Sequence, residues 1–210
     1  MTEPPEARVE WLTIGGDAMR WRALGLTVGG DGLVPFLFAS LRIVDGEPGV
    51  QGWALSGIDP AVRDIDGLPT TVVDASPPAI AQHANGAVEL DHVVVLTGSL
   101  ERTCGAIADA TSAPLKRVRE LGDTRQGFHR IGRGGLIVEV VERGEVGDDA
   151  ASLWGVVINV SDLDAALDLA GPELVGPAKD AVQSGRRIAT VRNEAGLGLP
   201  VAMMSLPGRP

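Results

Sequence analysis

The chain has 210 residues, of which 44% are hydrophobic and 22% charged, so it is long enough to fold around a substantial core. Its 28 acidic and 18 basic residues give a formal net charge of −10, which argues against nucleic-acid binding through a broad basic surface. No apolar run reaches the length of about 18 residues that a membrane-spanning helix needs, and no secretory signal pattern precedes the first regular element. The single cysteine, Cys104, excludes an internal disulfide, so we expect a cytoplasmic protein in which Cys104 is a small core residue.

Residues 8–58 predict a unit with the order strand, helix, strand, strand, strand. RVEWLTI is typical of a short strand, and Asp17 is expected to cap a helix over AMRWRALG. LVPFLFASLRIV and VQGWALSGI, with glycine-rich turns around them, predict the remaining strands. Segment 59–87 is rich in proline, aspartate and alanine, so we expect a surface connector with one short strand and one helical turn, and with His83 exposed.

Two further units follow at residues 88–145 and 152–206. The first begins with the strand ELDHVVVL and a helix capped by Ser99 or Thr97, and it continues through the strands RQGFHRI and GGLIVEVVE. The second begins with the strand WGVVINV and a helix capped by Asp162, and two or three strands complete it. Both therefore predict one helix and a small sheet.

These two units repeat at an offset of 63 residues, which brings Leu100 of TGSLERTCGAI onto Leu163 of VSDLDAALDLA. The same offset brings Gly135–Val138 onto Gly198–Val201 without a gap. Repeated supersecondary units must pack on one another to bury their open faces. We therefore expect an α+β protein of tandem βαβββ modules, with curved mixed sheets and the helices outside.

This pattern resembles the vicinal oxygen chelate superfamily, the glyoxalase and bleomycin-resistance fold. The resemblance lies in DHVVVLTGSLERT (91–103), GGLIVEVVE (134–142) and WGVVINVSDLDAA (154–166), and it covers most of 88–206 and, loosely, 8–58. It implies that the central and C-terminal modules pair as one glyoxalase-like domain with a trough for a small organic molecule. It also implies lyase, isomerase or dioxygenase activity, with a metal-free protein of the antibiotic-sequestering kind as the alternative.

The resemblance further implies up to four metal ligands from the first and last strands of the paired modules. His92 and Glu139 stand at these two places in the central module, where alternation predicts apolar residues, whereas the offset places Gly155 and Ala202 there in the next module. Three explanations stay open. His92 and Glu139 form a hydrogen-bonded pair in a metal-free trough, or they bind one divalent metal ion together with His129, another residue, a partner chain or water, or they are a satisfied histidine and a partly exposed glutamate. In an enzyme, Glu139 is the expected catalytic group.

Other side chains are expected to contact the ligand: Gln126, Phe128, Arg130, Trp154, Gln183 and Arg187. The first three alternate along one face of RQGFHRI, which places His129 on the solvent side. Gln183 and Arg187, together with Arg186, surround a Ser-Gly turn and would clamp an acidic or oxygenated group. The alternatives are an ordinary edge strand for the first group and solvated arginines on a hairpin turn for the second.

In the N-terminal unit, Trp11 or one of its neighbours takes the place of the histidine, and Trp53 and Ala54 lie near the place of the carboxylate. Three units leave one without an internal partner, and an open sheet tends to pair with another chain. The expected partners are therefore a small-molecule ligand and a second copy of the chain bound through residues 8–58, with neither nucleic acid nor membrane.

Overall fold

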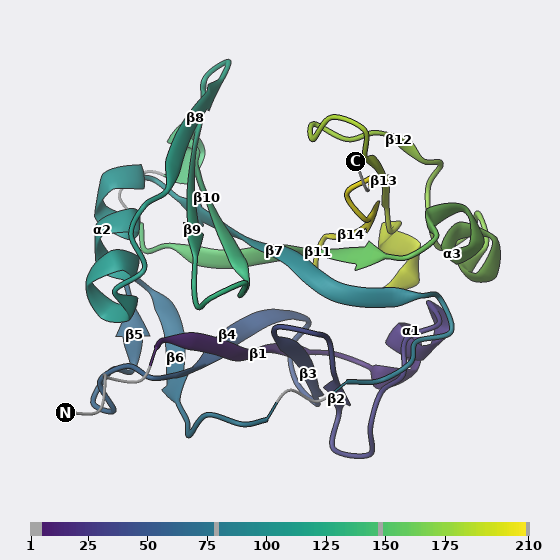
Figure 1. The fold of residues 1–210 in the computed structure, drawn as a ribbon, viewed down its shortest axis with the longest axis horizontal. Helices are drawn as coiled ribbons and strands as arrows, with labels where there is room; N and C mark the ends of the chain where they lie inside the picture. Colours follow the sequence, from purple (N-terminus) through teal and green to yellow (C-terminus); the bar gives the residue numbers. More distant parts are fainter. Residues whose placement is uncertain (1–5, 78–79, 147–148, 209–210) are drawn as a thin grey trace.

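The computed structural model describes residues 6–77, 80–146 and 149–208, which form two mixed β-sheets with helices at their ends (Figure 1). The strands of the first sheet are β1 (Arg8–Gly15), β2 (Leu33–Val34), β3 (Ser40–Val44), β4 (Gly49–Ser56), β5 (Asp64–Ile65) and β6 (Leu68–Val72). Those of the second are β7 (Ala87–Thr97), β8 (Arg117–Leu121), β9 (Thr124–Arg130), β10 (Ile137–Glu142), β11 (Ser152–Val160), β12 (Lys179–Asp180), β13 (Arg187–Thr190) and β14 (Val201–Ser205). The helices are α1 (Ala18–Ala23), α2 (Leu100–Thr111) and α3 (Leu163–Ala170), with 3-10 turns at Gly144–Val146 and Asn193–Ala195. The expected class, α+β with mixed sheets, is confirmed.

Each α-helix begins after a residue that the sequence predicts as its cap. Asp17, Ser99 and Asp162 each accept a hydrogen bond from a backbone N–H two or three residues further on, at 2.8, 3.4 and 3.0 Å. Such caps satisfy one of the N–H groups that a helix leaves without an internal partner. Leu100 and Leu163, the first residues of α2 and α3, are both buried.

The register of the second sheet confirms the offset of the sequence repeat. Val93 pairs with Val138 where β7 lies parallel to β10, and Val156 pairs with Val201 where β11 lies parallel to β14. Val156 follows Val93 by 63 residues, and Val201 follows Val138 by 63 residues. The same offset separates the helix caps Ser99 and Asp162. The strand order β12-β13-β14-β11-β7-β10-β9-β8 therefore consists of two units that meet at β7 and β11.

The first sheet has the same arrangement as the inner six strands of the second. Its order is β2-β3-β1-β4-β6-β5, with β1 parallel to β3, β4 parallel to β6, and β1 antiparallel to β4 at the centre. The strand predicted to end the N-terminal unit thus begins a second short unit, and β5 and β6 lie within the predicted connector. No helical pattern marks this unit, because a turn in which Asp59 accepts the N–H of Ala61 at 2.8 Å stands where a helix would be.

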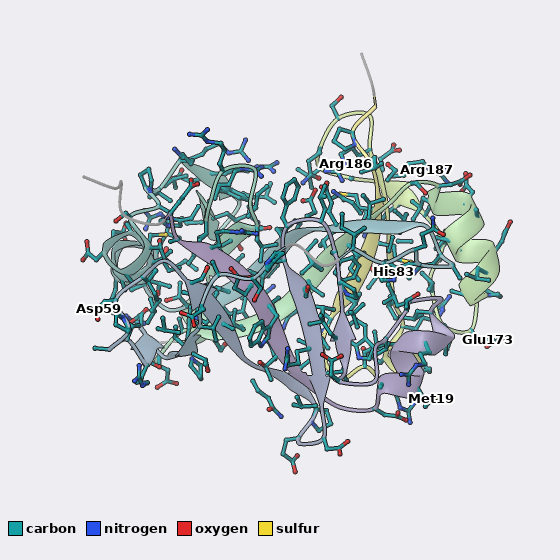
Figure 2. The ribbon with its side chains drawn as sticks, turned by 60° about the horizontal axis from the view of Figure 1, so that its bottom comes forward. Met19, Asp59, His83, Glu173, Arg186 and Arg187 are labelled. Carbon is teal, nitrogen blue, oxygen red and sulfur yellow. The ribbon has the colours of Figure 1, made fainter. Side chains whose placement is uncertain are left out.

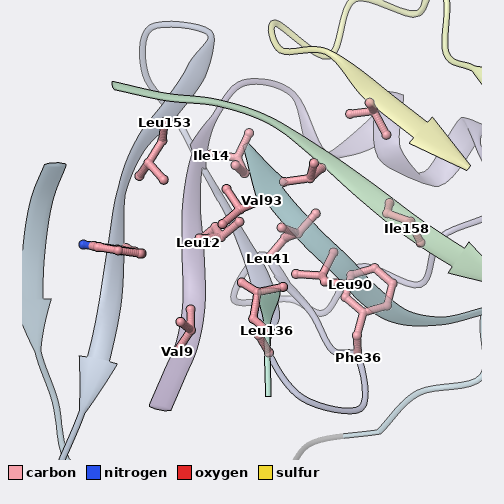
Figure 3. Close-up of a cluster of buried hydrophobic side chains, with 14 of the residues drawn as sticks. Val9, Leu12, Ile14, Phe36, Leu41, Leu90, Val93, Leu136, Leu153 and Ile158 are labelled. Atoms are coloured by element: carbon pink, nitrogen blue, oxygen red, sulfur yellow. The ribbon is translucent and has the colours of Figure 1, made fainter. Parts of the chain in front are cut away.

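The two sheets pack face to face around one apolar core (Figure 3). The side chains at this contact include Val9, Leu12, Ile14 and Leu41 from the first sheet and Leu90, Val93, Leu153 and Ile158 from the second. Burying each such side chain stabilises the fold by about 1.5–3 kcal/mol relative to leaving it in water. In Figure 1, the strands β8–β10 and β12–β14 rise on the other side of the β7–β11 pair. We call this side, turned away from the first sheet, the concave face.

Two expectations for single residues have opposite outcomes. Cys104 is buried in α2, as expected. His83, by contrast, is buried instead of exposed: its Nδ1 accepts the N–H of Thr27 at 3.0 Å, and its Nε2 donates to the carbonyl of Pro35 at 2.8 Å. Burial lowers the pKa of His83, although the hydrogen bond to Pro35 opposes that shift. Its partners are distant in sequence, so the polar local sequence gives no sign of them. Within the described ranges, no helix is both long enough and apolar enough to cross a membrane.

Candidate functional site

A β-bulge in β7 brings two neighbouring polar residues onto the concave face. Leu90 pairs with Ile158, and His92 pairs with Val157. Asp91, which lies between Leu90 and His92, therefore has no partner residue in β11. A bulge re-aims side chains that strict alternation would send to opposite faces. As a result, Asp91 and His92 meet, and Nδ1 of His92 donates to Oδ2 of Asp91 at 2.8 Å.

The other nitrogen of His92 contacts Glu139 on β10. Nε2 lies 3.3 Å from Oε2 of Glu139, and the two side chains are 11% and 15% exposed. A neutral imidazole that donates through Nδ1 can only accept at Nε2, and a carboxylate oxygen also only accepts. One proton must therefore reside on His92 or Glu139 for this contact to be favourable. Solvent still reaches both side chains.

Residues from the second unit fix Asp91 in place. Oδ1 of Asp91 accepts from Nδ2 of Asn159 and from Nη1 of Arg186, both at 2.9 Å. Arg186 is 8% exposed, also donates through Nη2 to Asn159, and donates through Nε to the carbonyl of Ser205 at 2.8 Å. Burial disfavours the charged form of Asp91, but hydrogen bonds from His92, Arg186 and Asn159 outweigh it and hold the pKa of Asp91 well below its usual range.

A row of side chains crosses the concave face beside Glu139. Phe128 of β9 pairs with Glu139, and Arg117 of β8 pairs with Phe128, so the three share one face. The guanidinium of Arg117 lies 4.7 Å from the centre of the Phe128 ring, a stacking distance for a cation on an aromatic face. In the neighbouring rows, Arg130 pairs with Ile137, which itself pairs with His92, and Gln126 pairs with Val141.

Comparisons with known proteins give a structural likeness without a sequence relative. No protein-family model matches the sequence, and no curated protein matches it. Among solved structures, a triple mutant of 4-hydroxymandelate synthase from Streptomyces coelicolor has a TM-score of 0.67 and 14% identity, over 98% of this chain and 94% of that chain. This chain has the vicinal oxygen chelate fold. Methylmalonyl-CoA epimerase from Mycobacterium tuberculosis matches at a TM-score of 0.49 and 14% identity, over 59% of this chain and 91% of that chain.

Within this vicinal oxygen chelate fold, the remaining predicted ligand contacts lie apart from the His92 network. Arg187 is exposed, and Figure 2 shows it beside its neighbour Arg186. Its Nη1 donates to both carboxylate oxygens of Asp164 on α3, at 2.9 and 2.8 Å. Its neighbour Arg186 enters the network instead. Gln183 is exposed in the turn before β13. Trp154 is 40% exposed at a second bulge of the β7–β11 pair, where Arg143 lies 5.6 Å from its ring.

His129 lies on the opposite face from Glu139 and is buried, contrary to the prediction that it faces solvent. It pairs with Val138, whose side chain belongs to the core, and it is 1% exposed. Its Nδ1 donates to the carbonyl of Ala113 at 2.9 Å, while burial lowers its pKa and favours the neutral ring. The apolar space beneath α2 accommodates this ring, and His129 cannot join His92 and Glu139 as a metal ligand.

The donor set does not fit the metal centre that the fold family implies. The strand register places Gly155 and Ala202 at the positions equivalent to His92 and Glu139. At Gly155 an added Cβ would lie 2.6 Å from the carbonyl oxygen of Pro200, so the backbone excludes a ligand side chain there. In the part of the chain that the structure describes, no group of three or more His, Cys, Asp or Glu side chains is placed to hold a metal ion. Catalytic zinc sites usually have three protein ligands, and His92 and Glu139 supply only two.

Sequence reasoning missed Asp91 and Asn159 as members of the site. Alternation along β7 assigns Asp91 to the face opposite His92, and the bulge that reverses this has no simple sequence signature. Asn159 did leave a signal, because it is a polar residue inside the apolar run GVVINV. It is 1% exposed, and a buried amide in a strand requires polar partners.

Proposed function

We propose that the concave face of the second sheet binds a small organic anion, and that Glu139 and His92 transfer a proton to or from it. The observation that carries this proposal is the contact of His92 with two carboxylates, Asp91 on one side and Glu139 on the other. The corresponding reaction class is an isomerisation or elimination that begins with removal of a proton from a carbon next to a carbonyl or carboxylate group. Positioned acid and base groups accelerate such steps by about 10²–10⁴-fold.

Glu139 is the group assigned to meet the substrate. Its Oε2 faces His92, whereas its Oε1 makes no hydrogen bond with any residue described by the structure. Glu139 takes the proton from carbon, and the protonated ring of His92 supplies the second proton to the substrate through Nε2. The proton on Glu139 then passes to Nε2, which it faces at 3.3 Å, and this restores the starting state. Asp91 stabilises the imidazolium and fixes the ring, because a carboxylate held by Arg186 and Asn159 stays ionised throughout.

The anionic character of the substrate follows from the row beside Glu139. Arg117 is exposed and stacked on Phe128, and it has no carboxylate within ion-pair distance among the described residues. The guanidinium of Arg117 lies over Phe128, and Phe128 pairs with Glu139 in the neighbouring strand. A small acid can therefore place its carboxylate at Arg117, its acidic C–H at Glu139 and its apolar part on Phe128.

Deuterium exchange tests this function with a panel of small acids that share the expected chemistry. We would incubate the protein in D₂O with 2-oxo carboxylates and malonate-type acids and follow loss of the C–H signal by proton NMR. Exchange that falls at least about 100-fold in Glu139→Gln supports the role of Glu139. Arg117→Gln should raise the KM for exchange. Arg187→Gln is the matched control, because Arg187 contacts α3 and not the concave face, and it should leave the KM unchanged. Exchange that is equally fast in Glu139→Gln would overturn the assignment.

A second candidate function, binding without catalysis, is favoured by one observation. Asp91, Asn159 and Arg186 form hydrogen bonds to one another so fully that the network also serves as a structural link between the two units. In that case calorimetry detects binding of a carboxylate, Arg117→Gln weakens it, and no member of the panel exchanges deuterium.

A further inference from the structure

The first sheet carries a bulge at the same place as the bulge that builds the His92 network. Val9 pairs with Leu55 and Trp11 pairs with Ala54, so Glu10 is one residue more than β4 can match. Oε1 of Glu10 accepts from the hydroxyl of Ser56 at 2.6 Å. In the second sheet, Asp91 is the extra residue and Asn159 is its donor from the partner strand. Both sheets therefore have a bulged acidic residue in one central strand that accepts a hydrogen bond from a polar residue of the other central strand.

This correspondence shows which residues of the first sheet replace the proton-transfer pair. Trp11 follows Glu10 as His92 follows Asp91, which agrees with the place that the sequence predicts for Trp11. The place of Glu139 is taken by Arg42. The strand register shows this equivalence. Arg42 pairs with Thr13, two residues after Trp11, and Glu139 pairs with Val94, two residues after His92. Trp53 and Ala54, predicted near this place, belong instead to the first strand of the next short unit.

The charge at the replaced position is therefore inverted, and Arg42 forms no ion pair with a carboxylate among the residues that the structure describes. The guanidinium carbon of Arg42 lies 4.4 Å from the centre of the Trp11 ring. Its Nε is buried and has no hydrogen-bond acceptor within residues 6–77, 80–146 and 149–208. The carboxylate of Glu10 lines the same cavity, but the described contacts of its oxygens are with the hydroxyl of Ser56 and the N–H of Ser76, at 2.6 and 3.4 Å, and not with Arg42. A buried donor on a cation that lacks an acceptor is unusual in a folded protein.

A cavity of about 90 Å³ opens beside Arg42. Its wall includes Arg8, Trp11, Phe36, Phe38, Ser40 and Arg42, so two cations and three aromatic rings surround it together with the carboxylate of Glu10. A water molecule takes about 30 Å³ in the liquid, so the cavity has the volume of about three waters or of one short organic acid. Its excess of positive charge and its aromatic wall favour the organic acid.

We propose that this cavity binds a small aliphatic carboxylate of about the size of propionate. The carboxylate accepts hydrogen bonds from Arg42 and Arg8, and the alkyl part packs against Trp11 and the phenylalanine rings. Stacking on Trp11 holds the guanidinium of Arg42 in one plane, which suits recognition of a planar carboxylate. The site lies in the first sheet and is independent of the function proposed for the concave face of the second.

Titration of the full chain with propionate, followed through the indole N–H signals in proton–nitrogen NMR, tests the proposal. Trp11→Phe and Trp154→Phe assign the two relevant signals, since Trp154 marks the other sheet. The Trp11 signal should shift and saturate, while the Trp154 signal stays in place, and propionamide should not compete. Arg42→Gln should weaken binding about tenfold or more, because a charge-assisted hydrogen bond is lost. Glu139→Gln and Arg187→Gln should bind as the unmodified chain does.

Several outcomes would overturn the site. These are a Trp11 signal that does not move with propionate, a shift confined to Trp154, or an affinity that neither Arg42→Gln nor Arg8→Gln changes. If Arg42→Gln fails to fold, as judged by its thermal unfolding without ligand, Arg8→Gln on the same wall decides between these results.

Discussion

Gly52 of β4 and Gly155 of β11 stand at the same place in the two sheets. At each, an added Cβ would lie 2.6 Å from a proline carbonyl oxygen, that of Pro69 or that of Pro200. Each glycine also lies next to a register shift in its sheet. The close approach of β11 to β14, and of β4 to β6, therefore depends on a residue without a side chain.

Replacement of Gly155 by alanine should lower the free energy of unfolding by about 1–3 kcal/mol, because the new methyl group displaces the backbone of Pro200. Urea denaturation measures this change. Gly105→Ala is the matched control: Gly105 lies inside α2, an added Cβ there meets nothing within 4 Å, and alanine should stabilise the helix by about 0.5–1 kcal/mol. Equal effects of the two substitutions would show that the approach at Pro200 is not tight.

Cys104 should not react with thiol reagents while the protein is folded. Burial raises the pKa of its thiol to about 11, so the reactive thiolate is scarce at neutral pH and reagents cannot reach it. Ellman's reagent should therefore label the native protein very slowly and the protein in concentrated guanidinium chloride at once, with one thiol per chain. Fast labelling of the native protein would mean that α2 opens locally.

The fold was largely predictable because its signals are local or periodic. The caps of the helices and the offset between the two units were confirmed by the structure, and alternation holds along the strands except at bulges such as that of Asp91. The short unit formed by β4, β5 and β6 was not recognised, because a turn at Asp59 replaces its helix and leaves no apolar period to detect.

The composition of the candidate site was harder to predict, for a different reason. His92 and Glu139 stood out as polar residues on apolar faces, but Asp91 reaches them through a bulge and Arg186 reaches them from another unit. Arg186 contacts Asp91, whereas its neighbour Arg187 contacts Asp164 on α3, because the two side chains point to opposite sides of the sheet. A shift of one residue in the register would exchange the two arginines, and the sequence pattern of a short turn does not determine that register.

The link between Asp91 and Arg186 should contribute strongly to stability. Asp91→Asn removes the charge that compensates Arg186, whose side chain is 8% exposed, and breaking a buried ion pair on one side costs about 3–5 kcal/mol. Urea denaturation at neutral pH measures the loss. Asp164→Asn, which removes the partner of the exposed Arg187, should change stability little. If the two variants lose the same amount, the Asp91 network is not a structural link.

The same pair predicts how stability depends on pH. The pKa of Asp91 is lower in the folded protein than its ordinary value of 3.8, because hydrogen bonds from His92, Arg186 and Asn159 outweigh the effect of burial. Above that ordinary value the ionised group contributes its full stabilisation, and the contribution falls as the pH decreases toward the folded-state pKa, by up to about 1.4 kcal/mol per pH unit. The difference in unfolding free energy between the unmodified chain and Asp91→Asn should thus be constant near neutral pH and shrink below about pH 4. Urea denaturation of both proteins across this range measures it, and a difference that stays constant down to about pH 2.5 would contradict the lowered pKa.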